Sequence, residues 1–213
     1  MSESYYCSGA VAASPGEAIL AALAAGRAKA TGIDEIIFLC ARRAQPPPEL
    51  PSGAPLSCWA NQPGLDGALL QHACRLLASG ERRQVLIVQQ ARARSAAVLL
   101  VGPAAIGIYN LVPAAQVHPG WTLPASLQPG AAAAAALDTA GVERAGIHWL
   151  AAGLTKEEMQ ACFPSARLTP RTPTGVIFKL NATARALKAK SPLACIIDAP
   201  EGQAVRVILV EKI

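Results

Sequence analysis

The sequence of 213 residues is poor in charged residues, which make up 15% of it, and in aromatic residues, which make up 4%. The few aromatics do not alternate with the arginines, so the sequence does not predict a nucleic-acid-binding face. Gly, Pro or Arg interrupts each apolar run within about ten residues, short of the roughly 20 needed to span a bilayer. Residues 1–4 carry no basic stretch, so we expect no signal peptide, no membrane association and a cytoplasmic protein.

Paired cysteines are also lacking. The six cysteines lie singly inside apolar segments and form no C-x-x-C pair, and the three histidines are isolated from one another. We therefore expect neither a metal site nor a cofactor, and we interpret the cysteines as small apolar residues of the core. They are Cys7, Cys40, Cys58, Cys74, Cys162 and Cys195.

What the sequence does have is a hydrophobic content of 52%, enough for a substantial core, and a net charge of +5. The positive charge comes mostly from arginine pairs, at Arg42 and Arg43, Arg82 and Arg83, Arg92 and Arg94, and Arg167 and Arg171. These pairs are typical of a solvated surface. An acidic partner such as an acyl carrier protein, or the phosphates of a coenzyme A thioester, is the alternative interpretation.

In the first half of the sequence, apolar runs alternate with helical patterns. Ser14 and Pro15 open a helix that we expect to end at Thr31 and Gly32, and the run after it predicts a parallel strand covered on both faces. Residues 45–54 are rich in proline and predict a surface loop. The predicted strands are residues 5–12, 33–41, 55–60, 84–89, 96–101 and 106–112, and a second helix follows Pro63, which we place at its first position.

The second half repeats this outline. Its predicted helices are residues 131–139, 155–162 and 175–190, and its predicted strands are residues 145–150, 193–199 and 205–210. We therefore predict two similar βαβαβ-type halves, residues 1–113 and 128–213, joined by a linker at residues 114–127. Alternation of helices and strands would also suit other layered α/β folds.

One stretch of the sequence is the best candidate for a functional motif. Residues 62–69 form a turn and helix start, followed by Leu76-Leu77-Ala78-Ser79-Gly80 and by the run at residues 84–88. Together they resemble the nucleophile turn, helix and following strand of the thiolase and ketoacyl synthase superfamily. The resemblance implies a shortened thiolase-like layered α/β fold. Gln62 stands where condensing members carry a cysteine, so the likeness is greatest to chain-length-factor and decarboxylase-type ketosynthases.

The resemblance also implies that the catalytic places are vacated. Condensation needs a thiolate and polar groups that stabilise the thioester oxyanion. In addition to Gln62, Gly153 stands where a histidine is expected, and Thr172 is the nearest equivalent of a second histidine or asparagine. Family dimers join through the strand before the turn, so the resemblance implies an interface at Leu56, Cys58, Trp59 and Asn61.

Three hypotheses follow. The first is a non-catalytic, chain-length-factor-like subunit that pairs with an active ketosynthase, or with itself, in fatty acid or polyketide-type biosynthesis. The second is a malonyl-thioester decarboxylase of the glutamine type. The third is an unrelated α/β protein that binds a small molecule or forms a homo-oligomer. Two halves around a pseudo-twofold axis would favour the first two, and a doubly wound single sheet would exclude both.

Overall fold

The structure is a computed structural model, and it describes residues 5–40, 50, 53–141, 148–152, 157, 160–161, 167–168, 175–187, 193–200 and 202–213. The first half contains β1 (Tyr5–Ala12), α1 (Pro15–Gly26), β2 (Glu35–Cys40), β3 (Leu56–Ala60), α2 (Leu65–Ala78), β4 (Gln84–Gln90) and β5 (Ser95–Val101). After α3 (Pro103–Tyr109), the second half contains β6 (Ala115–Leu123), α4 (Pro129–Ala140), β7 (His148–Ala152), β8 (Arg167–Leu168), α6 (Val176–Ala186), β9 (Leu193–Asp198) and β10 (Val205–Lys212).

The described strands form one sheet. Counted outward from its centre, the five strands of each half follow the same order relative to their order in the sequence. The order is β3-β2-β4-β5-β1-β6-β10-β9-β7-β8. In the first half, β2, β3 and β4 run parallel and β5 runs antiparallel to them; in the second half, β7, β8 and β9 run parallel and β10 runs antiparallel. The connectivity is therefore that of two similar halves related by a pseudo-twofold axis between β1 and β6, which confirms the predicted thiolase-like fold.

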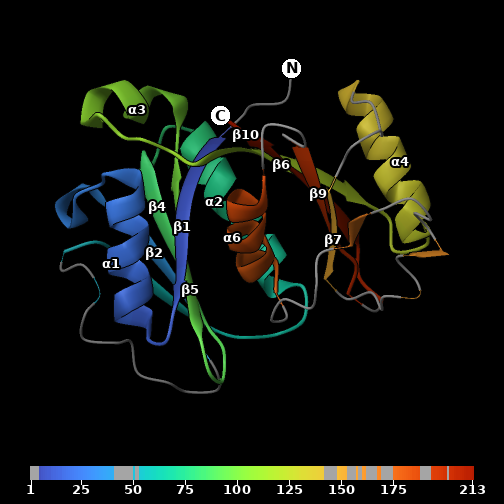
Figure 1. Cartoon of the computed structure of the whole chain (residues 1–213), viewed down its shortest axis with the longest axis horizontal. Helices are drawn as coiled ribbons and strands as arrows, with labels where there is room; N and C mark the ends of the chain where they lie inside the picture. The colour runs from blue at the N-terminus through green and yellow to red at the C-terminus, as the bar shows by residue number, and fades with distance from the viewer. Residues whose placement is uncertain are drawn as a thin grey trace.

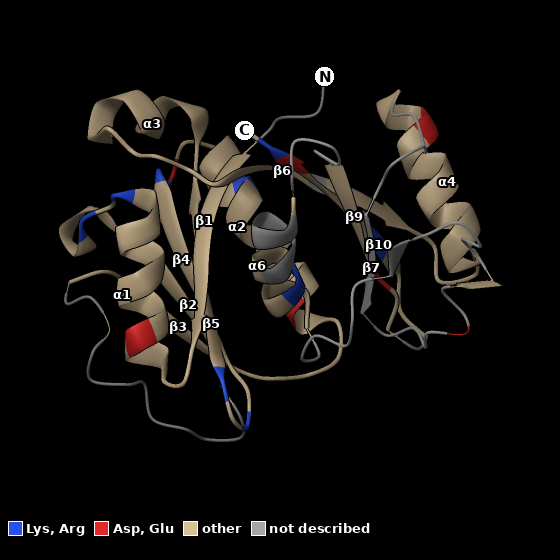
Figure 2. Cartoon of the chain, viewed as in Figure 1, with Lys and Arg blue, Asp and Glu red and all other residues tan. Residues whose placement is uncertain are grey.

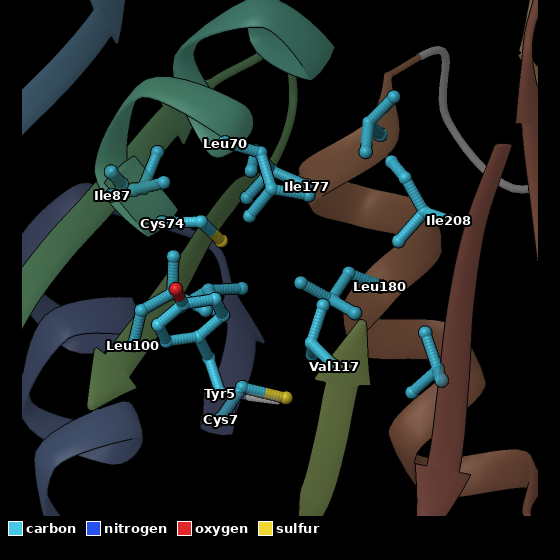
Figure 3. Packing of buried hydrophobic residues seen from close by; sticks show 14 of the residues in the cluster. Tyr5, Cys7, Leu70, Cys74, Ile87, Leu100, Val117, Ile177, Leu180 and Ile208 are labelled. Carbon is cyan, nitrogen blue, oxygen red and sulfur yellow. The ribbon is translucent and has the colours of Figure 1, made fainter. Parts of the chain in front are cut away.

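Helices cover the sheet halves in layers. Figure 1 shows α2 and α6 side by side in the middle of the molecule, between the two halves of the sheet, with α1 and α4 on the outer faces. The central helices contribute Leu70, Cys74, Ile177 and Leu180 to the largest apolar cluster, which also takes residues from both sheet halves (Figure 3). Separate clusters lie beneath α1 and α4. Because both faces of the parallel strands are buried, these strands carry apolar side chains at successive positions.

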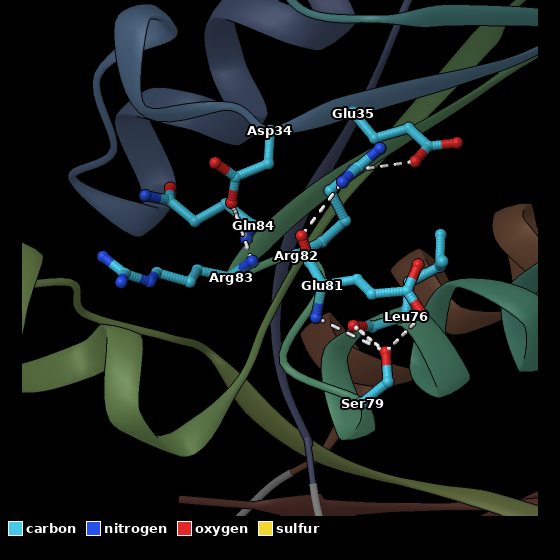
Figure 4. A network of polar contacts seen from close by, with 8 residues as sticks. All are labelled: Asp34, Glu35, Leu76, Ser79, Glu81, Arg82, Arg83 and Gln84. Carbon is cyan, nitrogen blue, oxygen red and sulfur yellow. Dashed lines mark hydrogen bonds and ion pairs between the residues drawn. The ribbon is translucent and has the colours of Figure 1, made fainter.

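A polar network ties the start of β4 to the start of β2 (Figure 4). The Asp34 carboxylate accepts the backbone N–H groups of Arg83, at 2.7 Å, and Gln84, at 2.8 Å. The Arg82 guanidinium lies 3.1 Å from the Glu35 carboxylate. These bonds fix the turn between α2 and β4, so they hold α2 in position from its C-terminal end.

Local signals at the helix ends explain where prediction succeeded. Ser14 caps α1 as predicted, and the structure adds a capping box with Glu17; Gly141 ends α4 in the left-handed conformation. The predicted end of α1 was wrong, because Arg27 already adopts the left-handed conformation (φ 53°) and closes the helix. Thr31 and Gly32 instead belong to a short 3-10 helix, Ala30–Gly32.

Two predictions between the halves were wrong. The run at residues 106–112 is not a strand, because Pro103 starts α3 and Asn110 ends it. The segment 114–127, expected to be a strand-poor linker, contains β6, which pairs with β1 and β10 at the centre of the sheet. Gly120 (φ 83°) lies where the β6–β10 register shifts, so the strand continues past Pro119 as a bulge. The boundaries of the two halves stay predictions.

The interpretation of the cysteines is confirmed for four of the six. Cys7, Cys40, Cys74 and Cys195 are buried, and burial raises the pKa of Cys7 and of Cys74 to about 12. Cys58 was expected in the core and is exposed, so that prediction was wrong. Cys162 and most of the predicted helix 155–162 lie outside the described residues. No described helix is long and apolar enough to cross a membrane.

Candidate functional site

The turn before α2 differs from its predicted geometry. Gly64 (φ 74°) is the N-cap of α2 and the helix begins at Leu65, so the prediction that Pro63 occupies the first helical position was wrong. The Leu65 N–H donates to the Gln62 carbonyl at 3.2 Å, and the Gln62 side chain is exposed. Gln203, in the turn between β9 and β10, donates to the Pro63 carbonyl at 3.4 Å. Gln62 therefore lies on an exposed turn rather than directly at the helix end.

Asp66 connects the two halves at the N-termini of the central helices. It is the second residue of α2 and only 4% exposed. Its carboxylate accepts the backbone N–H of Val176, the first residue of α6, 110 positions away. It also accepts the Gly67 N–H at 3.1 Å and Nε2 of Gln89 at 3.4 Å. A carboxylate in this position stabilises a helix because it faces unpaired N–H groups and the positive end of the dipole.

The pseudo-twofold axis places two strand-end residues in equivalent positions. Gln89 of β4 pairs with Leu39, and Asp198 of β9 pairs with Ala152 at the matching place in the other half. Each lies against the central helix of the opposite half. A methyl group on Gly175 would lie 2.7 Å from the Gln89 carboxamide, and one on Gly67 would overlap the Asp198 carboxylate. We call the region where the N-terminal ends of α2 and α6 meet the ends of β4 and β9 the junction. It is therefore closely packed from both sides.

Four charged side chains gather at this junction: those of Asp66, Lys179, Asp198 and Arg206. Figure 2 shows basic and acidic segments together at the end of α6. Arg206 of β10 lies 3.2 Å from Asp198, and Lys179 of α6 is 8% exposed. Burial, and then the negative charge of Asp66, raise the pKa of Asp198 to about 6, although Arg206 and Lys179 oppose this. Burial lowers the pKa of Lys179 against the attraction of both carboxylates.

Three of the predicted interface residues lie on β3, the outermost described strand of the first half, and Asn61 follows it directly. Among the described strands, β3 pairs only with β2. Leu56 is 40% exposed, Trp59 is 45% exposed, and Cys58 and Asn61 are exposed. Asn61 also accepts a hydrogen bond from Nε2 of Gln89, at 3.3 Å. The strand thus presents two large apolar side chains on an edge that no other described strand covers, and Asn61 directly after it contacts Gln89.

Sequence reasoning found only part of this site. Gln62 and Asn61 lie near the junction, whereas Gly153 and Thr172 lie outside the described residues. Gln89, Lys179, Asp198 and Arg206 were not predicted. A signal was present for two of them, because Gln89 and Asp198 are the first polar residues after the apolar runs Val85–Val88 and Ala194–Ile197. Among the described residues, no three His, Cys, Asp or Glu side chains form a metal-binding group.

The fold resembles that of several solved structures at low sequence identity. No protein-family model matches the chain, and no curated protein sequence matches it significantly. Human mitochondrial 3-ketoacyl-CoA thiolase superposes with a TM-score of 0.71 at 10% identity, covering 99% of both chains. A variant of Xanthomonas campestris OleA with bound lauric acid and lauroyl-CoA gives 0.68 at 12% identity, covering 92% of this chain and 81% of that one. The acyltransferase ChlB3 gives 0.66 at 10% identity, with coverages of 93% and 83%. The chain thus has the thiolase-like fold.

Proposed function

We propose that this chain is a non-catalytic, ketosynthase-like subunit of the chain-length-factor kind. It is cytoplasmic, and through β3 it pairs with an active ketosynthase, or with a second copy of itself, in fatty acid or polyketide-type biosynthesis. The observation that carries the proposal is the edge strand β3, which exposes Leu56 and Trp59 and, among the described strands, pairs with β2 alone. An exposed apolar edge strand is a liability in a lone protein, and tryptophan is a frequent interface anchor.

Two further observations support a subunit without its own condensing chemistry. Gln62 offers an amide where a condensing enzyme needs a thiol, and its side chain is exposed. The N-terminus of α6, a place suited to a developing oxyanion, already holds the Asp66 carboxylate. A substrate oxygen would have to displace a negative charge that is bound from within the chain.

Charged substitutions on β3 test the interface. We expect Trp59→Lys to weaken association at least about tenfold, because it replaces a large apolar contact with a solvated cation at a strand edge. The tagged chain is expressed in its native host, and its co-purifying proteins are identified by mass spectrometry. Sedimentation of the isolated chain then measures self-association.

Ile108→Lys is the matched control, because Ile108 is 60% exposed but lies on α3, away from β3. Capture of a ketosynthase that carries the nucleophilic cysteine would establish a heteromeric complex. A dimer of this chain alone would establish a homomeric one. If the Trp59→Lys and Ile108→Lys proteins associate equally with every partner, β3 is not the interface. Co-elution of an acyl carrier protein would identify the acidic partner that the arginine pairs suggest.

Incubation with malonyl thioesters tests the alternative, a malonyl-thioester decarboxylase. The exposed Gln62 amide favours that alternative because it could donate to a thioester oxygen. We expect no decarboxylation above the uncatalysed rate, and Gln62→Cys is expected to give an unactivated thiol that reacts with iodoacetamide at the rate of a free cysteine. Release of carbon dioxide that Gln62→Ala abolishes would favour the decarboxylase instead.

A further inference from the structure

The residues of β3 alternate in the direction of their backbone groups. The Asn61 N–H, directly after the strand, donates to the Cys40 carbonyl of β2 at 2.8 Å, so the odd-numbered residues direct their backbone groups toward β2. Neighbouring residues of an extended strand direct these groups to opposite sides. Three residues of β3 therefore point their N–H and C=O groups to the side on which no described strand lies: Leu56, Cys58 and Ala60.

The strand and its surroundings in the sequence are also uncharged. Residues 53–65 contain no Lys, Arg, Asp or Glu, although the chain has a net charge of +5. Edge strands are commonly protected from pairing by charged side chains or proline, and β3 itself has neither. In a symmetric pair, residues close to the twofold axis lie close to their own copies, so charged residues there would repel each other. A second copy of this chain meets no such repulsion at β3.

We propose that two copies of this chain pair antiparallel through β3, with the two Cys58 residues opposite each other at the twofold axis. The inference rests on the proposed β3 interface and commits that interface to a second copy. Cys58 is the middle residue of the 5-residue strand, so this register pairs Leu56 of each copy with Ala60 of the other. All the outward-pointing residues of the strand then exchange backbone hydrogen bonds across the axis.

The side chains favour this register over its neighbours. Opposite residues of an antiparallel pair lie on the same face, so Leu56 meets the small Ala60 of the other copy. Trp59 likewise meets the small Ser57. A shift of the axis by one residue, to Ser57 or Trp59, leaves one outward-pointing residue without a partner inside the strand. The register centred on Cys58 uses the whole strand and sets large side chains against small ones.

Thiol cross-linking tests the register. Residues that exchange backbone hydrogen bonds across antiparallel strands have Cα atoms about 5.5 Å apart, within the range that a disulfide spans. Diamide, an azo oxidant, takes up the two protons and two electrons that a pair of Cys58 thiols loses when the S–S bond forms. We expect diamide to convert the wild-type protein into a covalent dimer and to leave Cys58→Ser without one. A wild-type dimer that does not cross-link would overturn the proposal.

A displaced cysteine provides the matched control. The double variant Ser57→Cys, Cys58→Ser also carries one thiol on β3, but in the proposed register its two copies lie diagonally, about 7–8 Å apart. We expect it to cross-link at least about tenfold more slowly than the wild-type protein, because that separation exceeds the reach of a disulfide. Faster cross-linking of the double variant would place the axis at residue 57 and overturn the proposal.

Sedimentation of the isolated chain separates failure of this inference from failure of the proposed function. A dimer that Trp59→Lys weakens, with cross-linking that depends on Cys58, supports both. A chain that stays monomeric at every concentration but captures a ketosynthase through β3 overturns the self-pairing and leaves the proposed function standing. An assembly that Trp59→Lys does not weaken excludes the β3 interface, and both proposals fail with it.

Discussion

Gly67→Ala is expected to lower the free energy of unfolding by about 2–4 kcal/mol. Alanine is the better helix former by roughly 1 kcal/mol, so propensity alone predicts the opposite sign. The added methyl group would overlap the Asp198 carboxylate, and it would lie 3.4 Å from Cδ of Arg206. Asp198 is 2% exposed, so it cannot move without losing its contact with Arg206. Separating a buried ion pair costs roughly 3–5 kcal/mol, which exceeds the gain in propensity.

Gly107→Ala provides the control for Gly67→Ala. Gly107 also lies in a helix, α3, but nothing is within 4 Å of a methyl group placed there. We expect this variant to gain about 0.5–1 kcal/mol, because only the propensity term operates. Urea unfolding of both variants and of the wild-type protein measures the difference. Equal stabilisation of both would mean that the junction is loosely packed.

The repeated architecture could be predicted because apolar runs and helix-end residues, which are local sequence patterns, determine its elements. The continuous apolar runs of β2, β4 and β9, the Ser14 cap and the Gly141 stop each act over a few residues. The misassigned segments are those in which local preference and tertiary context disagree. Residues 106–112 carry strand-forming side chains but follow a Gly-Pro helix start. Conversely, β6 contains Pro119 and Gly120, which a bulge accommodates at the centre of the sheet.

The candidate site was less predictable because long-range contacts build it. Nothing local to Asp66 indicates that it meets Val176, 110 residues later. The left-handed conformation of Gly64 moves the helix start past Pro63, and this leaves Gln62 on an exposed turn. Buried charges such as Lys179 and Asp198 run against the expectation that charged residues are solvated. Their burial is explained only by the tertiary structure, in which the pseudo-twofold axis brings two helix N-termini together.

Stability should depend on pH through Asp198. Burial, followed by the charge of Asp66, raises the pKa of this carboxyl from 3.8 to about 6 in the folded protein. A raised carboxyl pKa means that the folded state binds a proton more tightly than the unfolded state does. The stabilising contribution of Asp198 is therefore complete only below about pH 3, well under the unfolded pKa of 3.8, and is lost as the pH rises through 6. At roughly 1.4 kcal/mol for each unit of pKa difference, the full contribution is about 3 kcal/mol, of which about 2 kcal/mol is lost between pH 4 and pH 7.

Asp198→Asn isolates this effect, because asparagine does not titrate. Asp66, Lys179 and Arg206 face Asp198 from α2, α6 and β10, and each contributes its own pH dependence and contact energy. The test is therefore how the difference in unfolding free energy between variant and wild type changes with pH, rather than its value at one pH. We expect the variant to gain about 2 kcal/mol relative to the wild type between pH 4 and pH 7, measured by urea unfolding at each pH. A difference that stays constant over this range would mean that Asp198 is ionised throughout, and that Lys179 and Arg206 outweigh its burial and the repulsion from Asp66.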